Sequence, residues 1–280
     1  MKIAIVAPAC TLDRAVADSV SALAREHYPS VELVFHPQCF LSWGHFAGTD
    51  AERSSAFLEA ANDPAFDAVW FARGGYGSNR LLETVLHRLE VPARRKTYLG
   101  YSDLGFLLAG LKVAGFPKLA HGPMPADFKR KDGEKAVRRA LDFLALGLRN
   151  GFDPAVEDNV PFAAFNITIL SELLGTPWQP DLSGHVLLLE DVSEHLYRID
   201  RAMFHITSNP AMRKVRGIRL GRVSDIQPND PDFAQTPEQI VRHWCEVSGI
   251  PYLGAADIGH DVENKIVPFG LWRPESASTS

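Results

Sequence analysis

The chain has 280 residues, of which 46% are hydrophobic and 22% are charged, and its formal net charge is −5. This apolar content is enough to bury the core of one large or two ordinary domains. No basic stripe interleaved with aromatic residues is present, which argues against nucleic acid as a partner. No apolar run approaches the roughly 20 residues that span a bilayer, so no membrane partner is expected either.

The compartment is indicated by the N-terminal segment and by the cysteines. The apolar run of residues 1–8 is too short for a signal peptide and is typical of a buried first strand. Cys10, Cys39 and Cys245 are few, widely separated and odd in number, which fits a reducing compartment better than a disulfide framework. These features predict a cytoplasmic protein.

Short apolar runs alternate with amphipathic stretches as far as residue 149. The predicted strands are 2–7, 31–35, 68–72 and 97–101, and the predicted helices are 12–28, 50–61, 79–89, 104–114 and 134–148. Such alternation is typical of an α/β domain with a parallel sheet covered by helices. Ligands of these sheets bind outside the carboxyl ends of the strands, so the loops that follow strands are where chemistry is expected.

The pattern of predicted strands and helices changes after residue 149. Gly151, Pro154 and Pro161 lie among acids and amides and predict a linker over 150–161. Beyond it, the predicted strands are 185–190, 215–223 and 265–272, and the predicted helices are 166–174, 196–206 and 237–247. The sequence therefore predicts an N-terminal domain (1–149) and a smaller mixed α/β C-terminal domain (162–280) with a frayed tail at 274–280.

Ser102 follows one of the predicted strands and begins a helix, in the segment Gly100-Tyr101-Ser102-Asp103. A serine on such a tight turn, with Gly100 leaving room for it, resembles a nucleophile elbow, although Leu104 departs from the full pattern. The N–H of Asp103 lies at a helix N-terminus and could form half of an oxyanion hole. Alternatively, Ser102 is an ordinary helix cap.

A glycine-rich segment, Arg73-Gly74-Gly75-Tyr76-Gly77, follows another predicted strand. Its glycines allow the backbone to approach a ligand closely, and the N–H of Gly75 could complete the oxyanion hole. The segment lacks the spacing of the nucleotide-binding motifs and could also be a plain turn. Arg73 has the fork geometry to hold a substrate carboxylate, or it pairs with a local acid.

His260 is the candidate base, because it lies on a loop between two apolar runs and could accept a proton from Ser102 across a domain interface. His121 is a rival, since it too follows a strand. A histidine base needs an orienting carboxylate. Glu190, Asp191 and Glu194 all lie at the end of an apolar strand, and spacing alone does not choose between them.

Taken together, these segments resemble the LD-carboxypeptidases, the serine peptidases of the S66 type. The resemblance covers nearly the whole chain in the right order. It includes the motifs at 7–8, 73–77, 80–82, 100–103, 121–123, 175–177, 189–191, 197–201, 259–260 and 268–270. It implies a Rossmann-like N-terminal domain, a smaller C-terminal domain and an active site at their interface.

The resemblance also implies site residues and partners. The family's Ser, Glu and His fall by motif match on Ser102, Glu190 and His260, and the match supports the N–H groups of Gly75 and Asp103 as the oxyanion hole. No metal or cofactor is implied. Members commonly form homodimers and release terminal D-alanine from murein tetrapeptides in the cytoplasm, during cell-wall recycling.

Three alternatives stay open. A sister branch, the microcin C immunity peptidases, cleaves an amide between an acidic residue and a nucleotide analogue. The chain departs from the family pattern at Ala164-Phe165-Asn166 and at Leu104-Gly105-Phe106, which leaves the substrate open. The other two are a non-catalytic module that closes on a small ligand and an amidohydrolase that uses Cys10.

Overall fold

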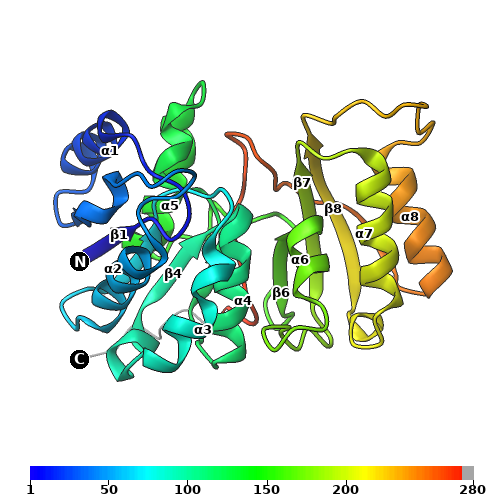
Figure 1. Ribbon diagram of the computed structural model, residues 1–280, viewed down its shortest axis with the longest axis horizontal. Coiled ribbons are helices and arrows are strands. Elements are labelled where there is room, and N and C mark those ends of the chain that lie inside the picture. Colours follow the sequence, from blue (N-terminus) through cyan, green and yellow to red (C-terminus); the bar gives the residue numbers. More distant parts are fainter. Residues whose placement is uncertain (273–280) are drawn as a thin grey trace.

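A computed structural model describes residues 1–272 of the chain, and the predicted tail at 274–280 lies outside these residues. The two halves of the sequence form two sheets that lie next to each other, each with its own helices (Figure 1). The first sheet has the strand order β10-β5-β4-β3-β1-β2 and is parallel except for β10. Its strands are β1 (Lys2–Val6), β2 (Glu32–Phe35), β3 (Ala68–Phe71), β4 (Thr97–Gly100), β5 (Leu119–His121) and β10 (Val267–Pro268).

Alternating side chains let the first sheet bury both of its faces. On β1, Ile3 and Ile5 pack into the core with α1 (Arg14–His27) and α5 (Gly133–Leu146). Ala4 and Val6 point to the opposite face, which is covered by α2 (Asp50–Asn62), α3 (Leu82–Val85) and α4 (Gly105–Val113). This two-sided burial is why the strands of the sheet are almost continuously apolar.

The second sheet is wholly parallel, with the order β6-β7-β8-β9. Its strands are β6 (Phe162–Asn166), β7 (Val186–Val192), β8 (Gly217–Ser224) and β9 (Tyr252–Ala255). One face packs against α6 (Ile167–Leu173), α7 (Leu196–Ser208) and α8 (Pro237–Ser248), and the other face is covered by chain segments that include Ile258 and Val267. The predicted α/β class is confirmed.

The structure corrects several predicted elements. The predicted helix at 79–89 is split into two 3-10 turns around α3, and the predicted strand at 265–272 shrinks to β10. Pro268 has no N–H to donate, and at Gly270, with φ +112°, the chain leaves β5 and pairs with Phe162 instead, which ends β10. The strands β6 and β9 were missed, because β6 is buried without alternation and β9 is a short edge strand.

The chain crosses back to the first sheet near its end. Residues of β10 pair antiparallel with His121 and Ala120 of β5. Residues 267–268 belong to the predicted C-terminal domain by sequence, but they form a strand of the first sheet. Among residues 1–272, no helix has the length and apolarity needed to cross a bilayer.

Close packing of α4 against α6 joins the two halves. A Cβ added to Gly105 of α4 would lie 3.1 Å from Ile169 Cγ2 and 3.3 Å from a ring carbon of Phe165. One apolar core runs through this contact from α2 and α4 to α7 and α8. The missing side chain at Gly105 therefore sets how closely the halves approach.

The substitution Gly105→Val tests this junction. The branched side chain would press on Ile169 and Phe165, and overpacking of this kind costs about 1–3 kcal/mol. We expect urea denaturation to show a loss of that size. Lys135→Val places the same residue at an exposed position of α5 and should cost less. Equal losses in both variants would show that the junction tolerates the extra volume.

Candidate active site

Ser102 occupies a strained position directly beyond β4. Its φ is +62°, a left-handed conformation that side chains other than glycine rarely adopt and that costs on the order of 1–3 kcal/mol. The short 3-10 turn Ser102–Leu104 has Tyr101 as its cap residue, and no side chain caps it. The helix-cap alternative for Ser102 is therefore wrong, and the strained turn leaves its hydroxyl free for another contact.

That contact is with His260, which lies on the loop between β9 and β10. The Nε2 atom of His260 lies 3.0 Å from Ser102 Oγ, and its Nδ1 atom lies 2.8 Å from Glu190 Oε2. Glu190 is on β7 and is fully buried, and the side chain of His260 is 10% exposed. The structure thus brings together in one hydrogen-bonded chain three residues that the sequence places far apart.

The two other candidate carboxylates point elsewhere. Asp191 accepts hydrogen bonds at 2.9 Å from the N–H and the hydroxyl of Thr168. Successive residues of a strand face opposite sides, which separates Asp191 from Glu190. Burial, aided by the neighbouring Glu190, raises the pKa of Asp191 to about 6. Glu194 lies 3.4 Å from Arg198 on α7. Of the three candidates, Glu190 is the one that contacts His260.

His121, the rival base, is buried at the end of β5. Its Nε2 atom lies 3.0 Å from the side-chain oxygen of Asn264, and burial lowers the pKa of the imidazole. The ring of Tyr101 packs edge-on against His121 and also contacts His260, with centroid distances of 5.4 and 5.0 Å. His121 therefore supports the wall behind Tyr101 and makes no contact with Ser102.

Two opposing effects act on His260. Burial by itself lowers the pKa of the imidazole, but the charge and the hydrogen bond of Glu190 outweigh it, so the pKa is raised above its ordinary value of 6.5. A carboxylate beside a histidine favours the protonated ring in this way. The ring also gains a fixed tautomer, because the Nδ1–H donates to Glu190 and leaves Nε2 free to accept from Ser102.

The substitution Glu190→Gln removes the largest cause that raises the pKa of His260. It leaves the smaller effects of Asp127 and Asp191, and it leaves the burial that lowers the pKa. We therefore expect the His260 pKa to fall, so that the ring stays neutral to lower pH than in the wild type. An NMR titration of the imidazole measures this. Asp191→Asn is the matched control one residue away, and it should move the pKa of His260 much less. A larger shift in the control would mean that Asp191 sets the protonation of the ring.

The side chain of Asp103 braces the glycine-rich loop. One of its carboxylate oxygens accepts the N–H groups of Gly77 and Ser78, both at 3.0 Å, and the Ser78 hydroxyl donates to the Asp103 carbonyl at 2.6 Å. The fully buried Arg53 also donates to the Gly77 carbonyl, at 2.9 Å. The loop and the Ser102 turn are thereby held as one unit, a connection that the motif itself does not reveal.

Replacement of Asp103 by alanine should loosen this brace. Two buried N–H groups would lose their acceptor, at about 1–3 kcal/mol each, so their hydrogen exchange should speed up by about tenfold or more. Exchange measured by mass spectrometry over residues 73–78 detects the change. Asp103→Asn keeps a carbonyl oxygen as acceptor, so its exchange rate should lie between those of the wild type and Asp103→Ala. Asp67→Ala, at the far end of the sheet, should leave the loop unchanged.

The backbone of the glycine-rich loop runs directly against Ser102. A Cβ on Gly74 would lie 2.8 Å from Ser102 Cβ, and Gly75 has φ +90°. The Gly75 N–H donates to no group in residues 1–272. Gly100 has a different function from the predicted one, because a Cβ there would lie 2.7 Å from the ring of Phe71 on β3. It makes room for the core, and the left-handed turn is at Ser102 itself.

Cys10 lies beneath this loop, where its sulfur fills the space next to Gly75. Its Sγ is 3.4 Å from Nε2 of His45, a contact that sequence spacing does not predict. Burial raises the pKa of the Cys10 thiol, which keeps it protonated. A protonated thiol is a poor nucleophile. Burial of the thiol thus argues against the alternative that uses Cys10, while the contact with His45 supplies the imidazole that such a nucleophile would need.

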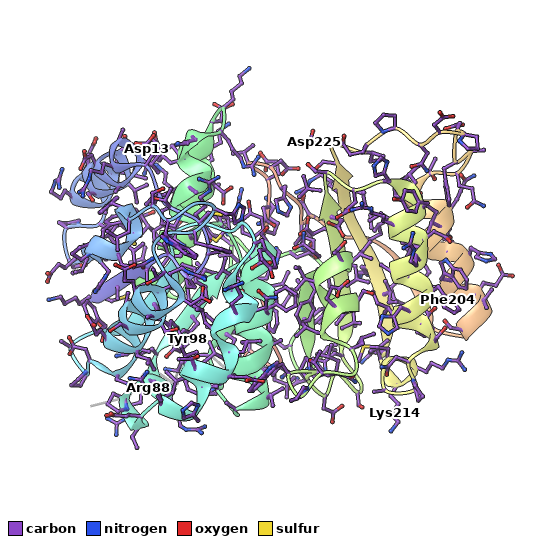
Figure 2. All side chains as sticks on the ribbon, in the orientation of Figure 1. Asp13, Arg88, Tyr98, Phe204, Lys214 and Asp225 are labelled. Atoms are coloured by element: carbon purple, nitrogen blue, oxygen red, sulfur yellow. The ribbon has the colours of Figure 1, made fainter. Side chains whose placement is uncertain are left out.

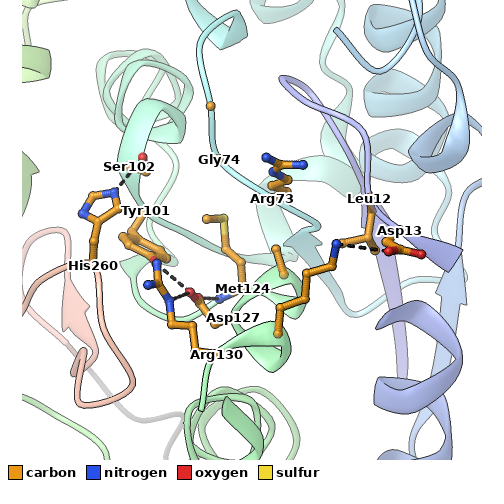
Figure 3. Close-up of a pocket in the computed structure, with 13 residues that line it drawn as sticks. Leu12, Asp13, Arg73, Gly74, Tyr101, Ser102, Met124, Asp127, Arg130 and His260 are labelled. Atoms are coloured by element: carbon orange, nitrogen blue, oxygen red, sulfur yellow. Dashed lines mark hydrogen bonds and ion pairs between the residues drawn. The ribbon is translucent and has the colours of Figure 1, made fainter. Parts of the chain in front are cut away.

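A cavity of about 370 Å³ opens beside Ser102 and His260 (Figure 3). Its charged lining residues are Asp13, Arg73, Asp127, Lys129 and Arg130. Arg73 donates to the Thr11 carbonyl at 3.0 Å and has no acidic partner in the part of the chain that the structure describes. Sequence reasoning missed Asp127 and Arg130, which lie beyond His121 and carry no motif.

Comparisons with known proteins agree with this site. The sequence pattern of the LD-carboxypeptidase N-terminal domain matches residues 3–122, and that of the C-terminal domain matches residues 162–273. The chain belongs to the LD-carboxypeptidase family. The predicted family and the predicted enzyme class, a serine-type carboxypeptidase, are thereby confirmed.

Relatives and solved structures of this family match most of the chain. A putative carboxypeptidase of Synechocystis is 32% identical over 85% of this chain and 79% of its own. The murein tetrapeptide carboxypeptidase of Pseudomonas aeruginosa is 26% identical over 96% of this chain and 91% of its own. The crystal structure of muramoyltetrapeptide carboxypeptidase from Oxalobacter formigenes matches 96% of this chain and 93% of its own, with a TM-score of 0.80 and 25% identity. The microcin C7 self-immunity protein shares the fold. Its structure matches 96% of this chain and 91% of its own, with a TM-score of 0.79 and 19% identity.

Proposed function

We propose that this protein releases the terminal D-alanine of murein tetrapeptides by hydrolysing the bond between an L-configured centre and that residue. The observation that carries the proposal is the hydrogen-bonded chain from Glu190 through His260 to Ser102. Two similar proteins bear the names murein tetrapeptide carboxypeptidase and muramoyltetrapeptide carboxypeptidase. The cavity beside Ser102 has room for a short peptide end and carries charges of both signs.

The proposed reaction follows the usual order for a serine, histidine and carboxylate set. Nε2 of His260 takes the proton of Ser102 Oγ, and the oxygen attacks the scissile carbonyl. The protonated ring is stabilised by Glu190, then gives its proton to the leaving amine. Water, activated by the same histidine, hydrolyses the acyl-enzyme and releases Ser102.

The N–H groups of Gly75 and Asp103 are the proposed oxyanion hole. Asp103 lies in the first turn after β4, where N–H groups lack an intrahelical acceptor. Gly75 presents an N–H without an acceptor in the described residues, on a loop that touches Ser102. Because the Asp103 carboxylate ties that loop to its own turn, both donors would be fixed before substrate binds, which is the condition for strong stabilisation.

The substitution Ser102→Ala tests the proposal. Purified wild type and variant are incubated with murein tetrapeptide, and the products are analysed by mass spectrometry. We expect the wild type to remove one alanine and the variant to lose activity by about 10⁴-fold or more, because its nucleophile is gone. Thermal unfolding serves as the control for folding. Alanine keeps the Cβ of serine and therefore the same strained φ, so the variant should unfold at close to the wild-type temperature.

Other outcomes would identify a different substrate. Cleavage by both proteins would exclude Ser102 as the nucleophile. If a folded wild type leaves the tetrapeptide intact, an acidic aminoacyl-nucleotide amide is the next substrate to test, since the chain shares the fold of the microcin C7 self-immunity protein. Absence of turnover on both would favour a binding module.

The family also supports a cytoplasmic homodimer, built from domains at 1–149 and 162–280 with the linker 150–161 between them. The domain patterns of the family at 3–122 and 162–273 lie within these two ranges. Analytical ultracentrifugation measures the association: a mass of twice 30.9 kDa is expected.

A further inference from the structure

The cavity beside Ser102 has two differently equipped sides (Figure 3). His260, Tyr101 and Arg130 lie on one side, and Arg73, Leu12 and Asp13 lie on the other, with Met124 between them. If the proposed function holds, His260 delivers a proton to the departing amine, so the departing residue must lie on the His260 side. The acyl part of the substrate is then left to the Arg73 side.

A carboxypeptidase must recognise the free carboxylate of the residue that leaves. That carboxylate is one carbon away from the departing nitrogen, so its partner must also lie on the His260 side. Arg130 is the cation found there. We propose that Arg130 anchors the terminal carboxylate of the substrate, an assignment that rests on the proposed function.

Arg130 is held in a fixed orientation by one edge of its guanidinium. Its Nε atom donates to Asp127 Oδ1 at 2.9 Å, and its Nη2 atom donates to the Tyr101 hydroxyl oxygen at 3.5 Å. Asp127 is itself 4% exposed and also accepts from the Tyr101 hydroxyl at 2.7 Å and from the Met124 N–H at 2.9 Å. The buried carboxylate is thus a built support for a cation at the cavity wall.

The other edge of the guanidinium is available for a ligand. Nη1 has no partner in residues 1–272, and the Arg130 side chain is 38% exposed where it lines the cavity. A planar fork with one anchored edge and one open edge suits bidentate binding of a carboxylate. Arg130 pairs with Asp127 and Lys129 pairs with Asp13 at 3.1 Å, so the surplus positive charge of the cavity wall is that of Arg73.

Arg73, the residue singled out by the sequence, is less suited to this task. Its Nη1 atom is engaged by the Thr11 carbonyl, no buried acid supports it, and it lies across the cavity from His260. Arg73 therefore serves as the matched control: the same side chain, in the same cavity, on the acyl side.

The experiment compares the murein tetrapeptide with the same peptide ending in D-alaninamide, for wild type, Arg130→Gln, Arg130→Lys and Arg73→Gln. Loss of a charged hydrogen-bond partner costs about 2–5 kcal/mol, so Arg130→Gln should lower kcat/KM on the free acid by about 30-fold or more. It should change kcat/KM on the amide by less than about threefold, because the amide cannot use the anchor. Arg130→Lys should restore part of the loss, and Arg73→Gln should keep the wild-type preference for the acid.

Three results would overturn the assignment while the proposed function stands. Equal cleavage of acid and amide by the wild type would show that no carboxylate anchor exists. Loss of the acid preference in Arg73→Gln with none in Arg130→Gln would make Arg73 the anchor while the proposed function stands. A parallel drop on both substrates in Arg130→Gln would mean that Arg130 acts only by supporting Tyr101 and His260. Failure of the wild type on both substrates would instead refute the proposed function, and the assignment with it.

Discussion

The contact between Ser102 and His260 depends on how two separate sheets are docked. The two residues are 158 positions apart, one beyond the first sheet and the other on a loop leaving the second. A hydrogen bond tolerates only a few tenths of an ångström before it weakens, so the relative position of the sheets must be fixed at that level. Two features meet this requirement: an apolar core that continues from α4 into α6, and a C-terminal segment that returns to pair with β5. The crossing of the chain is thus part of the site's geometry.

Burial of Glu190 gives the site its electrostatic character. A carboxylate with no exposed surface is costly unless a partner compensates it, and Oε1 has no partner in residues 1–272. Its charge is therefore directed at one group, the Nδ1–H of His260. Asp191, on the other side of the strand, accepts hydrogen bonds from Thr168 instead, and its pKa is raised by its burial and, to a smaller extent, by the charge of Glu190. One β-strand thus places two adjacent acids in two unrelated environments.

The sequence predicted which distant residues come together in this site better than it predicted the contacts that hold them there. The residues Ser102, Glu190 and His260 could be found because each follows or interrupts a strand, and a family pattern chose between Glu190 and its neighbours. The long helices and buried strands were found by periodicity, whereas β6 and β9 escaped it because burial on both faces or shortness removes alternation. The brace from Asp103, the pairing of Cys10 with His45 and the support of Arg130 by Asp127 could not be predicted. The first two join separate loops, whose relative placement is set only when the first sheet is assembled. Asp127 and Arg130 are only three residues apart in one turn, but no motif marks that turn as part of the cavity wall.

Tyr101 connects the two tasks that this site would have to perform. Its ring packs against His260, and its hydroxyl is bonded to Asp127, the acid that holds Arg130. Tyr101 is also the residue immediately before the strained Ser102, so its ring and the serine turn share one backbone segment. One buried side chain, that of Tyr101, is therefore linked to the base, to the nucleophile and to the proposed anchor of the substrate end. If Arg130 is the anchor of the terminal carboxylate, this shared support fixes its position relative to the nucleophile, and so limits how far from the scissile bond the terminal carboxylate of a substrate can lie.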